Sequence, residues 1–504
     1  MKKVLALVLD AADPALIERW IKTGDLPNLQ RMQEHGMYGR VTSYAEWLAE
    51  ATPFAFYTGQ SPASHGVHCY VMWDAETMKL RPPSPDWLPI RPFWRRFSEG
   101  GPRAVVLDVS NSYTPEPFHG VEIVGWATHD SLIPFSSYPP EITAWIHRDY
   151  GSAIMPDEIY GTFGKQEFIR DRDLMLEISG KFSRLCIDLM KKESWDFFLA
   201  YMFTVHHGGH RLWGTTNIKQ ILSDMEKSEL SDALRQVYMA GDKAIGEIID
   251  QAGENTIVMV MSMHGMGINN SRTWILPDLL RLILREEHPE TISFSFVKKI
   301  RDAIPLDLRH RVKSSLPHDW RRWLTRFWRN GYDWKKTRAF TLASDTHGWI
   351  QINLKGRETE GIVEVEDYEA LCEKISVGLR SFVDADTGKP IVEAVARSSQ
   401  LYKGEKQGLL PDLIVRWANS PAAEHRSVTS SEFGTIAWPT PGQNPEGRSG
   451  NHQPDGFFMM SGHGINPGAI EDIHILDLAP TILSILGQPI PDEMEGNVLR
   501  MVKP

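Results

Sequence analysis

The chain has 504 residues, of which 42% are hydrophobic and 24% charged, and its formal net charge at pH 7 is -11. This is the composition of an ordinary globular protein, and the length allows a large apolar core. Because an acidic chain gains nothing from phosphate backbones, we expect no nucleic-acid partner.

The first apolar run, Val4–Leu9, predicts a buried strand rather than a signal peptide, because it is short and ends at Asp10 without a cleavage pattern. No apolar stretch of the sequence reaches the roughly 20 residues that a transmembrane helix needs. Cys69, Cys186 and Cys372 are too few and too scattered for a disulfide framework or a thiolate metal site. Together these features predict a cytoplasmic protein without a transmembrane segment.

Strand-like apolar runs alternate with amphipathic helical patterns along the chain. This alternation predicts an α/β fold with a mostly parallel central sheet and helices on both faces. The helices expected nearest the two ends of the sequence are Pro14–Thr23 and Ile475–Leu486. The runs that predict strands are Val4–Leu9, Ala104–Leu107, Val121–Val124, Asp196–Met202, Thr256–Met261, Trp349–Leu354 and Leu413–Trp417.

The sequence has no repeats, low-complexity tracts or long linkers, so we expect residues 1–504 to form a single domain with elaborations. Two stretches look like insertions: residues 130–185 carry many prolines and aromatic residues, and residues 270–340 are rich in arginine and tryptophan. We predict that residues 270–340 form an amphipathic helical cap over the active face of the sheet. An anion-binding or lipid-binding surface is the alternative.

Three candidate metal ligands lie beside predicted strands. Asp10 comes directly after the first strand, where open parallel sheets bind ligands, and its alternative role is to cap the following helix. His264 follows the strand Thr256–Met261 in the string MSMHGMG, whose glycines indicate a sharp turn; a histidine satisfied within the core is the alternative. His452 lies in a polar loop, RSGNHQPDG, before a strand at Phe457–Met460.

Two further histidines, His206 and His210, follow the strand Asp196–Met202 in the string FTVHHGGHRLWG. Their spacing of four residues places both imidazoles on one side of a helical turn, as a metal ion requires. The glycines between them weaken a regular helix. We interpret His207 as structural, because this geometry directs its ring elsewhere.

The four candidate histidines and the aspartate form a stronger signal together than any of them does alone. Neutral imidazoles and a carboxylate suit zinc and other first-row metals. The sequence therefore predicts a divalent metal site, with zinc as the first expectation and iron or manganese as the alternatives.

Six segments of the sequence carry distinctive motifs: VLALVLDAADPALIERWIKTGDLPNLQRM, YTGQSPASHGV, MSMHGMG, WIQINLKGRETEGIV, NHQPDGFFMMSGHGI and DLAPTILSILGQPIPDEMEGNVL. They resemble segments of the type I phosphodiesterase/nucleotide pyrophosphatase family of the alkaline phosphatase superfamily. They run in the family's order from residue 4 to about residue 499 and leave the central insertions uncovered. The resemblance implies an alkaline-phosphatase-like α/β sandwich.

The resemblance also implies a hydrolase with two adjacent metal ions, held by Asp and His, and a Thr or Ser nucleophile. This sequence departs from that pattern at three positions. Ala49 stands where the family has its nucleophile, and His206 and Met263 each replace a metal-binding aspartate. The matching ligand positions that are kept are Asp10, His210, His264 and His452.

These departures change the metal set that the resemblance implies. The first site becomes His206, His210 and His452, which can hold one ion and leave room for water or substrate. The second site keeps only Asp10 and His264, so we expect its ion to be weakly bound or absent.

Residues near the vacant nucleophile position are the candidates for catalysis. Glu50 is interpreted as a ligand or a general acid/base, or else as a first-turn glutamate favoured by the helix dipole. Thr52 is either a displaced nucleophile or an N-cap followed by Pro53, and we favour the cap. His65 matches a family histidine that we interpret as structural. Because a methionine sulfur is a poor ligand for a hard ion, Met263 is expected to pack.

We therefore expect a metal-dependent hydrolase of phosphate or related esters, in which water on a single histidine-bound ion attacks a small anionic substrate. Two alternatives stay open. Three histidines also hold iron, which would make the chain a non-hydrolytic mononuclear metalloenzyme, and the same fold could be a non-catalytic binding protein. A homo-oligomer is compatible with the sequence.

Overall fold

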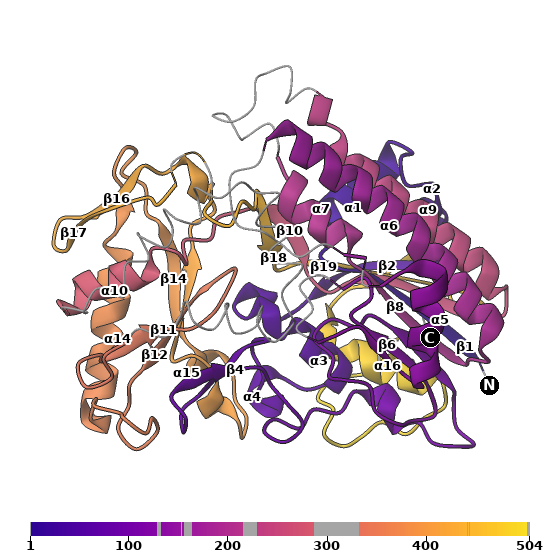
Figure 1. Cartoon of the computed structure of the whole chain (residues 1–504), viewed down its shortest axis with the longest axis horizontal. Helices are drawn as coiled ribbons and strands as arrows, with labels where there is room; N and C mark the ends of the chain where they lie inside the picture. The colour runs from indigo at the N-terminus through magenta and orange to yellow at the C-terminus, as the bar shows by residue number, and fades with distance from the viewer. Residues whose placement is uncertain are drawn as a thin grey trace.

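A sheet of ten described strands runs through the larger of two lobes (Figure 1). The strand order is β20-β2-β19-β9-β1-β8-β5-β6-β7, and β21 pairs with β2. The bounds are β1 Lys3–Leu9, β2 Met37–Thr42, β5 Ala104–Leu107, β6 Gly120–Val124, β7 Ser136–Tyr138, β8 Phe197–Met202, β9 Thr256–Ser262, β19 Gly456–Ser461, β20 Gly468–Ala469 and β21 Ile473–His474. The structure is a computed structural model that describes residues 2–128, 133–152, 154–155, 164–214, 229–286, 332–440, 442 and 444–500.

The central strand β1 shows why this sequence forms a sheet. Val4, Ala6 and Val8 point into one apolar cluster, and the leucines between them point into another. A strand buried on both faces has a continuous apolar sequence, so the predicted strand Val4–Leu9 is confirmed. β1 pairs in parallel with β8 and β9, and the carboxyl ends of these three strands therefore meet at one edge of the sheet.

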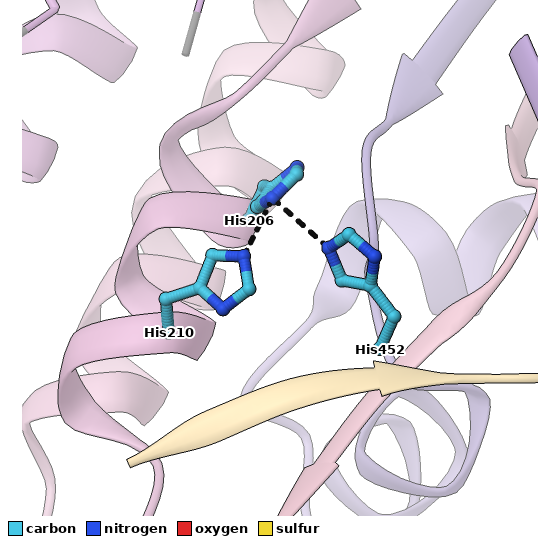
Figure 2. A group of neighbouring side chains, drawn as sticks. All are labelled: His206, His210 and His452. Carbon is cyan, nitrogen blue, oxygen red and sulfur yellow. Dashed lines mark hydrogen bonds between the residues drawn. The ribbon is translucent and has the colours of Figure 1, made fainter. Parts of the chain in front are cut away.

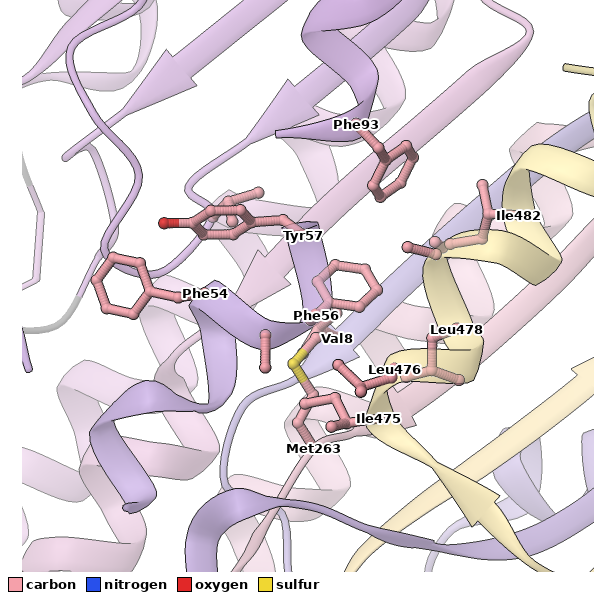
Figure 3. Close-up of a cluster of buried hydrophobic side chains, with 14 of the residues drawn as sticks. Val8, Phe54, Phe56, Tyr57, Phe93, Met263, Ile475, Leu476, Leu478 and Ile482 are labelled. Atoms are coloured by element: carbon pink, nitrogen blue, oxygen red, sulfur yellow. The ribbon is translucent and has the colours of Figure 1, made fainter. Parts of the chain in front are cut away.

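Helices cover both faces of this sheet, which confirms the predicted α/β fold with a mostly parallel central sheet (Figure 1). Residues of α1, α2, α6 and α9 belong to the cluster on one face. On the other face, α3 packs against α16, and Figure 3 shows Phe54 and Phe56 of α3 in the same cluster as Val8 and Leu478. The bounds are α1 Pro14–Lys22, α2 Pro27–His35, α3 Thr52–Thr58, α6 Lys165–Lys192, α9 Ala233–Ala252 and α16 Leu478–Ile485.

A smaller lobe has its own antiparallel sheet in the order β11-β12-β15-β14 and its own apolar cluster. The predicted strands Trp349–Leu354 and Leu413–Trp417 are confirmed as strands, but they lie in this sheet and not in the parallel one. Helices α10 and α14 pack against each other beside it. The bounds are β11 Ala339–Thr341, β12 Gly348–Ile352, β14 Val392–Arg397, β15 Leu413–Trp417, α10 Leu276–Leu284 and α14 Val365–Arg380.

Most of the cap predicted for residues 270–340 lies outside the described residues, because residues 287–331 are not among them. At the two described ends of that range, α10 and β11 pack against each other within the smaller lobe. The cap itself stays a prediction.

Among the helices that the structure describes, none combines the length and the apolar character needed to cross a bilayer. The other described elements include β3 Met72–Asp74, β4 Lys79–Arg81, β10 Gly265–Ile268, β13 Val383–Asp384, β16 Ser427–Ser430, β17 Gly434–Ala437, β18 Gly450–Gln453, α4 Pro62–His65, α5 Pro140–Tyr150, α7 Thr204–Leu212, α15 Ser398–Leu401, η1 Tyr44–Glu46 and η2 Ala49–Ala51.

Candidate metal centre

The edge of the sheet where β1, β8 and β9 end brings the predicted ligands together. Asp10 follows β1, helix α7 follows β8, and His264 follows β9. The antiparallel ribbon of β10 and β18 then pairs Met266 with His452, which carries the last histidine to the same edge. Residues that are far apart in the sequence thus meet because three neighbouring strands share a direction.

Helix α7 presents His206 and His210 on one side, one turn apart. The glycines between them do not interrupt the helix, which runs unbroken over Thr204–Leu212. They allow close packing instead: a Cβ on Gly209 would lie 2.8 Å from a side-chain carbon of Met266, and one on Gly208 would lie 3.2 Å from Val237. The small residues let α7 approach both the β10 ribbon and α9.

The rings of His206, His210 and His452 converge through their Nε2 atoms, as Figure 2 shows. The Nε2 atom of His206 lies 2.9 Å from that of His210 and 3.2 Å from that of His452. One candidate ligand atom from each of the three rings lies within 4.8 Å of the other two. Among the described residues, this is the one group of three or more histidine, cysteine or acidic side chains whose ligand atoms lie close enough together to hold a metal ion.

Hydrogen bonds on the far side of two rings fix which nitrogen faces the cluster. His206 donates from Nδ1 to Asp10 Oδ2 at 2.5 Å, and His210 donates from Nδ1 to the Gly450 carbonyl oxygen at 2.9 Å. A neutral imidazole that is protonated at Nδ1 directs a lone pair from Nε2. Lone pairs that meet at 2.9 Å repel each other unless a proton or a cation lies between them. This donor set fits a first-row divalent metal.

Asp10 is fully buried at the end of β1 beside two of the histidines. Burial opposes ionisation of its carboxyl group, but the attraction and hydrogen bond of His206 outweigh that effect and hold the pKa of Asp10 below its usual value. Asp10 thus contacts His206 at Nδ1, the ring nitrogen that faces away from the cluster. Direct metal ligation by Asp10 stays a prediction.

His264 lies against the cluster without joining its converging atoms. Its ring centroid is 4.6 Å from that of His452 and 6.4 Å from that of His206. Both of its ring nitrogens are buried and have no hydrogen-bond partner among the described residues. Burial lowers the pKa of His264 to about 4, so the ring is neutral at pH 7. Its role as a ligand stays a prediction.

Two residues that the resemblance places at the nucleophile and ligand positions, Ala49 and Met263, carry no donor for a hard metal. Ala49 is buried at the start of η2, where its methyl group offers no hydroxyl. Met263 is buried in the core, and its sulfur accepts a hydrogen bond from the Tyr201 hydroxyl at 3.5 Å, which confirms that it packs. His65 accepts from the Val67 amide at Nδ1, as expected of a structural histidine.

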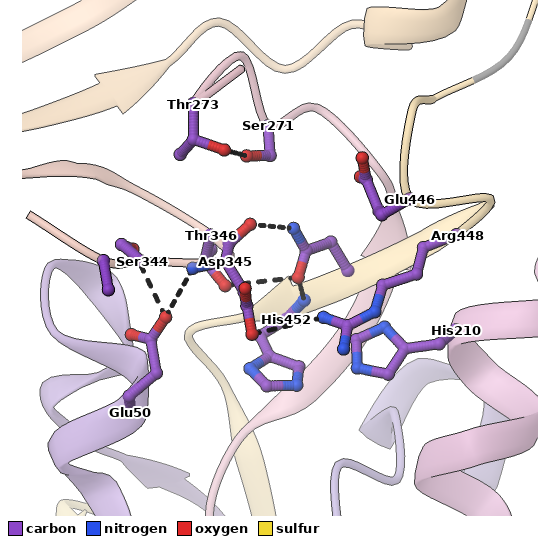
Figure 4. Close-up of polar contacts among 12 residues, drawn as sticks. Glu50, His210, Ser271, Thr273, Ser344, Asp345, Thr346, Glu446, Arg448 and His452 are labelled. Atoms are coloured by element: carbon purple, nitrogen blue, oxygen red, sulfur yellow. Dashed lines mark hydrogen bonds and ion pairs between the residues drawn. The ribbon is translucent and has the colours of Figure 1, made fainter. Parts of the chain in front are cut away.

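Glu50 is a buried carboxyl group with one occupied and one vacant oxygen. Its Oε1 accepts from the Asp345 amide at 2.9 Å and from the Ser344 hydroxyl at 3.3 Å (Figure 4). Its Oε2 is buried without a hydrogen-bond partner among the described residues. Burial, reinforced by the nearby Asp345 carboxylate, raises the pKa of Glu50 to about 7. The group can therefore take up and release a proton near neutral pH.

The interpretation of Thr52 as an N-cap is wrong. Thr52 has helical dihedral angles and is the first residue of α3, whose N-cap is Ala51, and no side chain caps this end of the helix. The Thr52 hydroxyl is buried without a hydrogen-bond partner among the described residues. Its alternative role as a displaced nucleophile stays a prediction.

Sequence reasoning did not identify the polar network beside His452. Asn451 donates to the Asp345 carbonyl oxygen at 2.9 Å, and the Asp345 carboxylate pairs with Arg448 at 3.4 Å (Figure 4). Asp345 belongs to the loop between β11 and β12, more than 100 residues before Arg448. The loop sequence RSGNHQPDG contains Arg448 and Asn451, but nothing in it indicates this partner.

Comparison with solved structures gives the fold a context. Phosphonoacetate hydrolase from Sinorhizobium meliloti 1021, in complex with phosphonoformate, is 13% identical with a TM-score of 0.51; alignment covers 96% of each chain. Its phosphonoacetate complex is 12% identical with a TM-score of 0.52, again over 96% of each chain. Murine ectonucleotide pyrophosphatase/phosphodiesterase 5, an inactive variant in complex with AMP, aligns over 97% of this chain and 96% of its own, with 12% identity and a TM-score of 0.46.

Comparison with family models identifies the family. The curated protein sequences contain no match to this chain. The model of the type I phosphodiesterase/nucleotide pyrophosphatase family matches residues 4–419, which include Asp10, His206 and His210 but end before His452. The chain therefore belongs to the type I phosphodiesterase/nucleotide pyrophosphatase family, a family of metal-dependent hydrolases that act on small anionic phosphate substrates.

Proposed function

We propose that this protein hydrolyses phosphate or related esters with a single divalent metal ion, which the Nε2 atoms of His206, His210 and His452 hold. The observation that carries the proposal is the convergence of three Nε2 atoms, two of which belong to rings whose Nδ1 atoms already donate elsewhere. Three neutral histidines suit zinc first, with iron or manganese as the alternatives.

A divalent ion bound by these histidines would polarise a phosphoryl oxygen and lower the pKa of coordinated water. Asp10 orients His206 and makes its ring more basic, as carboxylate partners of metal-binding histidines do. The same contact occupies one carboxylate oxygen of Asp10, and Met263 packs in the core, which leaves few donors for a second ion. We therefore propose one tightly held ion per chain instead of the family's two.

The proposed nucleophile is water, because Ala49 cannot attack phosphorus. Glu50 follows Ala49 directly and is the candidate proton acceptor for that water. Its Oε2 is the buried oxygen without a partner among the described residues, and its pKa of about 7 suits proton transfer at neutral pH. The Thr52 hydroxyl is a second candidate for contact with the substrate.

Metal analysis of the full chain, purified without added metal, tests this proposal. We expect one zinc per chain together with esterase activity on a phosphate ester. His210→Ala and His452→Ala should each remove most of the metal, and His35→Ala, at an exposed position on α2, should keep it. Metal that survives both cluster substitutions would show that these histidines are not the ligands.

The identity of the metal separates the proposal from its alternatives. Three histidines also leave open positions on iron, so one iron per chain without esterase activity would favour a non-hydrolytic metalloenzyme. A folded chain without any metal would favour a non-catalytic binding protein.

A further inference from the structure

The segment that carries Arg448 is fastened to the helix that bears two of the histidines. The Ser449 amide donates to the His210 carbonyl oxygen at 2.7 Å, and Arg211 donates to the Gly447 carbonyl oxygen at 3.2 Å. Gly450, the first residue of β18, accepts from His210 Nδ1 at 2.9 Å. Arg448 is thus flanked on both sides by contacts to α7.

The main chain of Arg448 is fixed by a second set of bonds. Its carbonyl oxygen accepts from the side-chain amides of Asn269, at 3.1 Å, and Asn444, at 2.9 Å. Only 8% of the Arg448 side chain is exposed. Figure 4 shows its guanidinium group directed toward the side of the site where the rings of His210 and His452 lie.

Asp345 holds the Arg448 guanidinium group and is itself held from two directions. Its Oδ2 lies 3.4 Å from an Arg448 nitrogen, and 27% of its side chain is exposed. The Asp345 amide donates to Glu50, and its carbonyl oxygen accepts from Asn451. These bonds tie Arg448 to both the candidate proton acceptor and the strand that carries His452.

A buried guanidinium group that points toward the side of the site where the rings of His210 and His452 lie (Figure 4) has a clear electrostatic consequence. A divalent cation on the three histidines would raise the potential around this group, and the single carboxylate of Asp345 would not balance both cations. A guanidinium group also presents paired N–H donors that match the oxygens of a phosphate group. The arrangement favours an anionic ligand.

We infer that Arg448 binds the non-bridging oxygens of the substrate's phosphate group, and that Asp345 positions the guanidinium group for this contact. The inference rests on the proposed function and adds the residue that would recognise the anionic group. Arg448 would bind the phosphate in the ground state and also as charge builds on its oxygens during attack.

Calorimetric titration of the full metal-loaded chain with inorganic phosphate tests the inference. Arg448→Met should weaken phosphate binding about tenfold to hundredfold, the range for a lost hydrogen bond to a charged group. Its metal content should stay that of the wild type. Arg338→Met removes an arginine that pairs with Glu286 in the smaller lobe, and it should leave phosphate binding unchanged.

Asp345→Asn distinguishes an Arg448 that binds phosphate from one that serves only as the partner of Asp345 in a structural ion pair. It removes the negative charge but keeps Arg448 and a side-chain oxygen that can still accept from the guanidinium group and position it, so phosphate should bind as tightly as in the wild type or more tightly. Weakening equal to that of Arg448→Met would overturn the inference. If Arg448→Met does not fold, the double variant with Asp345→Asn leaves no unpaired buried charge, and unchanged phosphate affinity in that variant would also overturn it.

The outcomes distinguish this inference from the proposed function. If the wild type contains no metal but binds phosphate, and Arg448→Met loses that binding, the metal-dependent function is refuted and the role of Arg448 is supported. Metal-loaded wild type whose phosphate affinity is unaffected by Arg448→Met would leave the metal site intact and refute the role of Arg448.

Discussion

At the scale of single residues, the contact between Asp10 and His206 determines how the cluster can work. A carboxylate bound to one imidazole nitrogen fixes the ring and strengthens the opposite nitrogen as a donor. Since Asp10 Oδ2 is 2.5 Å from His206 Nδ1, we propose that this aspartate acts through His206. This role differs from the direct ligation that the family resemblance implies.

Asp10→Asn tests that role. Replacing the carboxylate with an amide should weaken metal binding roughly 10- to 100-fold without abolishing it, as loss of such a partner does. Titration of the metal-free variant with zinc measures this change. Asp13→Asn, which keeps a side chain able to cap α1, is the matched control and should bind zinc as the wild type does. Complete loss of zinc in Asp10→Asn would instead identify Asp10 as a direct ligand.

Glu50 makes stability depend on pH. Its pKa of about 7 in the folded protein exceeds its ordinary value of 4.5, so its favourable contribution is complete below about pH 4.5 and is lost as the pH rises through about 7. Glu50→Gln should therefore gain stability relative to wild type above pH 7, on the order of 3 kcal/mol. Urea unfolding at pH 4.5 and pH 8 measures the difference. If the difference in free energy of unfolding between Glu50→Gln and the wild type does not increase from pH 4.5 to pH 8, the raised pKa of Glu50 is wrong. Glu34→Gln, at an exposed position, should unfold with the same free energy as the wild type at both pH values.

Sequence reasoning found the cluster but not the contacts around it. The four-residue spacing of His206 and His210 has a direct geometric meaning on a helix, so their convergence could be predicted. Thr52 could not be assigned from the Thr-Pro pattern, because the preceding η2 turn runs directly into α3 and makes Ala51 the cap. The pairing of Asp345 with Arg448 depends on how two loops meet, which local sequence does not encode.

At the scale of secondary-structure elements, apolar runs predicted where the strands lie more reliably than they predicted which sheet each strand joins. β1 and β15 both lie where continuous apolar runs occur, yet one is central to the parallel sheet and the other lies in the antiparallel sheet. A strand that is buried on both faces has the same sequence signature in either setting. The connections between strands decide the partner, and many of these are long.

Arg272 is a buried link between the β10 ribbon and the smaller lobe. It donates from Nε to His425 Nε2 at 2.9 Å and from Nη1 to the Ala418 carbonyl oxygen at 3.1 Å. His425 in turn pairs through Nδ1 with Asp384 Oδ2 at 2.5 Å. The chain therefore crosses from the larger lobe into α10 beside a charge network that is buried and hydrogen-bonded.

Arg272→Ala should destabilise the protein by about 3–5 kcal/mol, because removing one partner of a buried charge network leaves the others without compensation. Chemical denaturation followed by intrinsic fluorescence measures the change. Arg148→Ala, at an exposed position on α5, should change stability by no more than about 0.5 kcal/mol. Equal effects at the two positions would show that the Arg272 network contributes nothing specific.

At the scale of the whole molecule, the free energy of unfolding should depend on the concentration of the metal ion. An ion that binds only the folded chain stabilises it by about 4 kcal/mol at a thousand times its dissociation constant. Addition of zinc should therefore raise the melting temperature by several degrees, and a chelator should reverse the shift. Calorimetric scans of the wild type and His452→Ala provide the test. An equal shift in His452→Ala would mean that zinc stabilises the protein elsewhere.

The separation of the three histidines along the chain also sets when the ion can be captured during synthesis. A ribosome-bound chain that has not yet reached residue 452 carries only the pair on α7, and two imidazoles retain a divalent ion poorly. Capture of an ion by the proposed three-histidine site must therefore wait until residue 452 of the 504-residue sequence has been added. A tightly held ion at that site would consequently distinguish a chain that extends past residue 452 from one whose translation stopped before it.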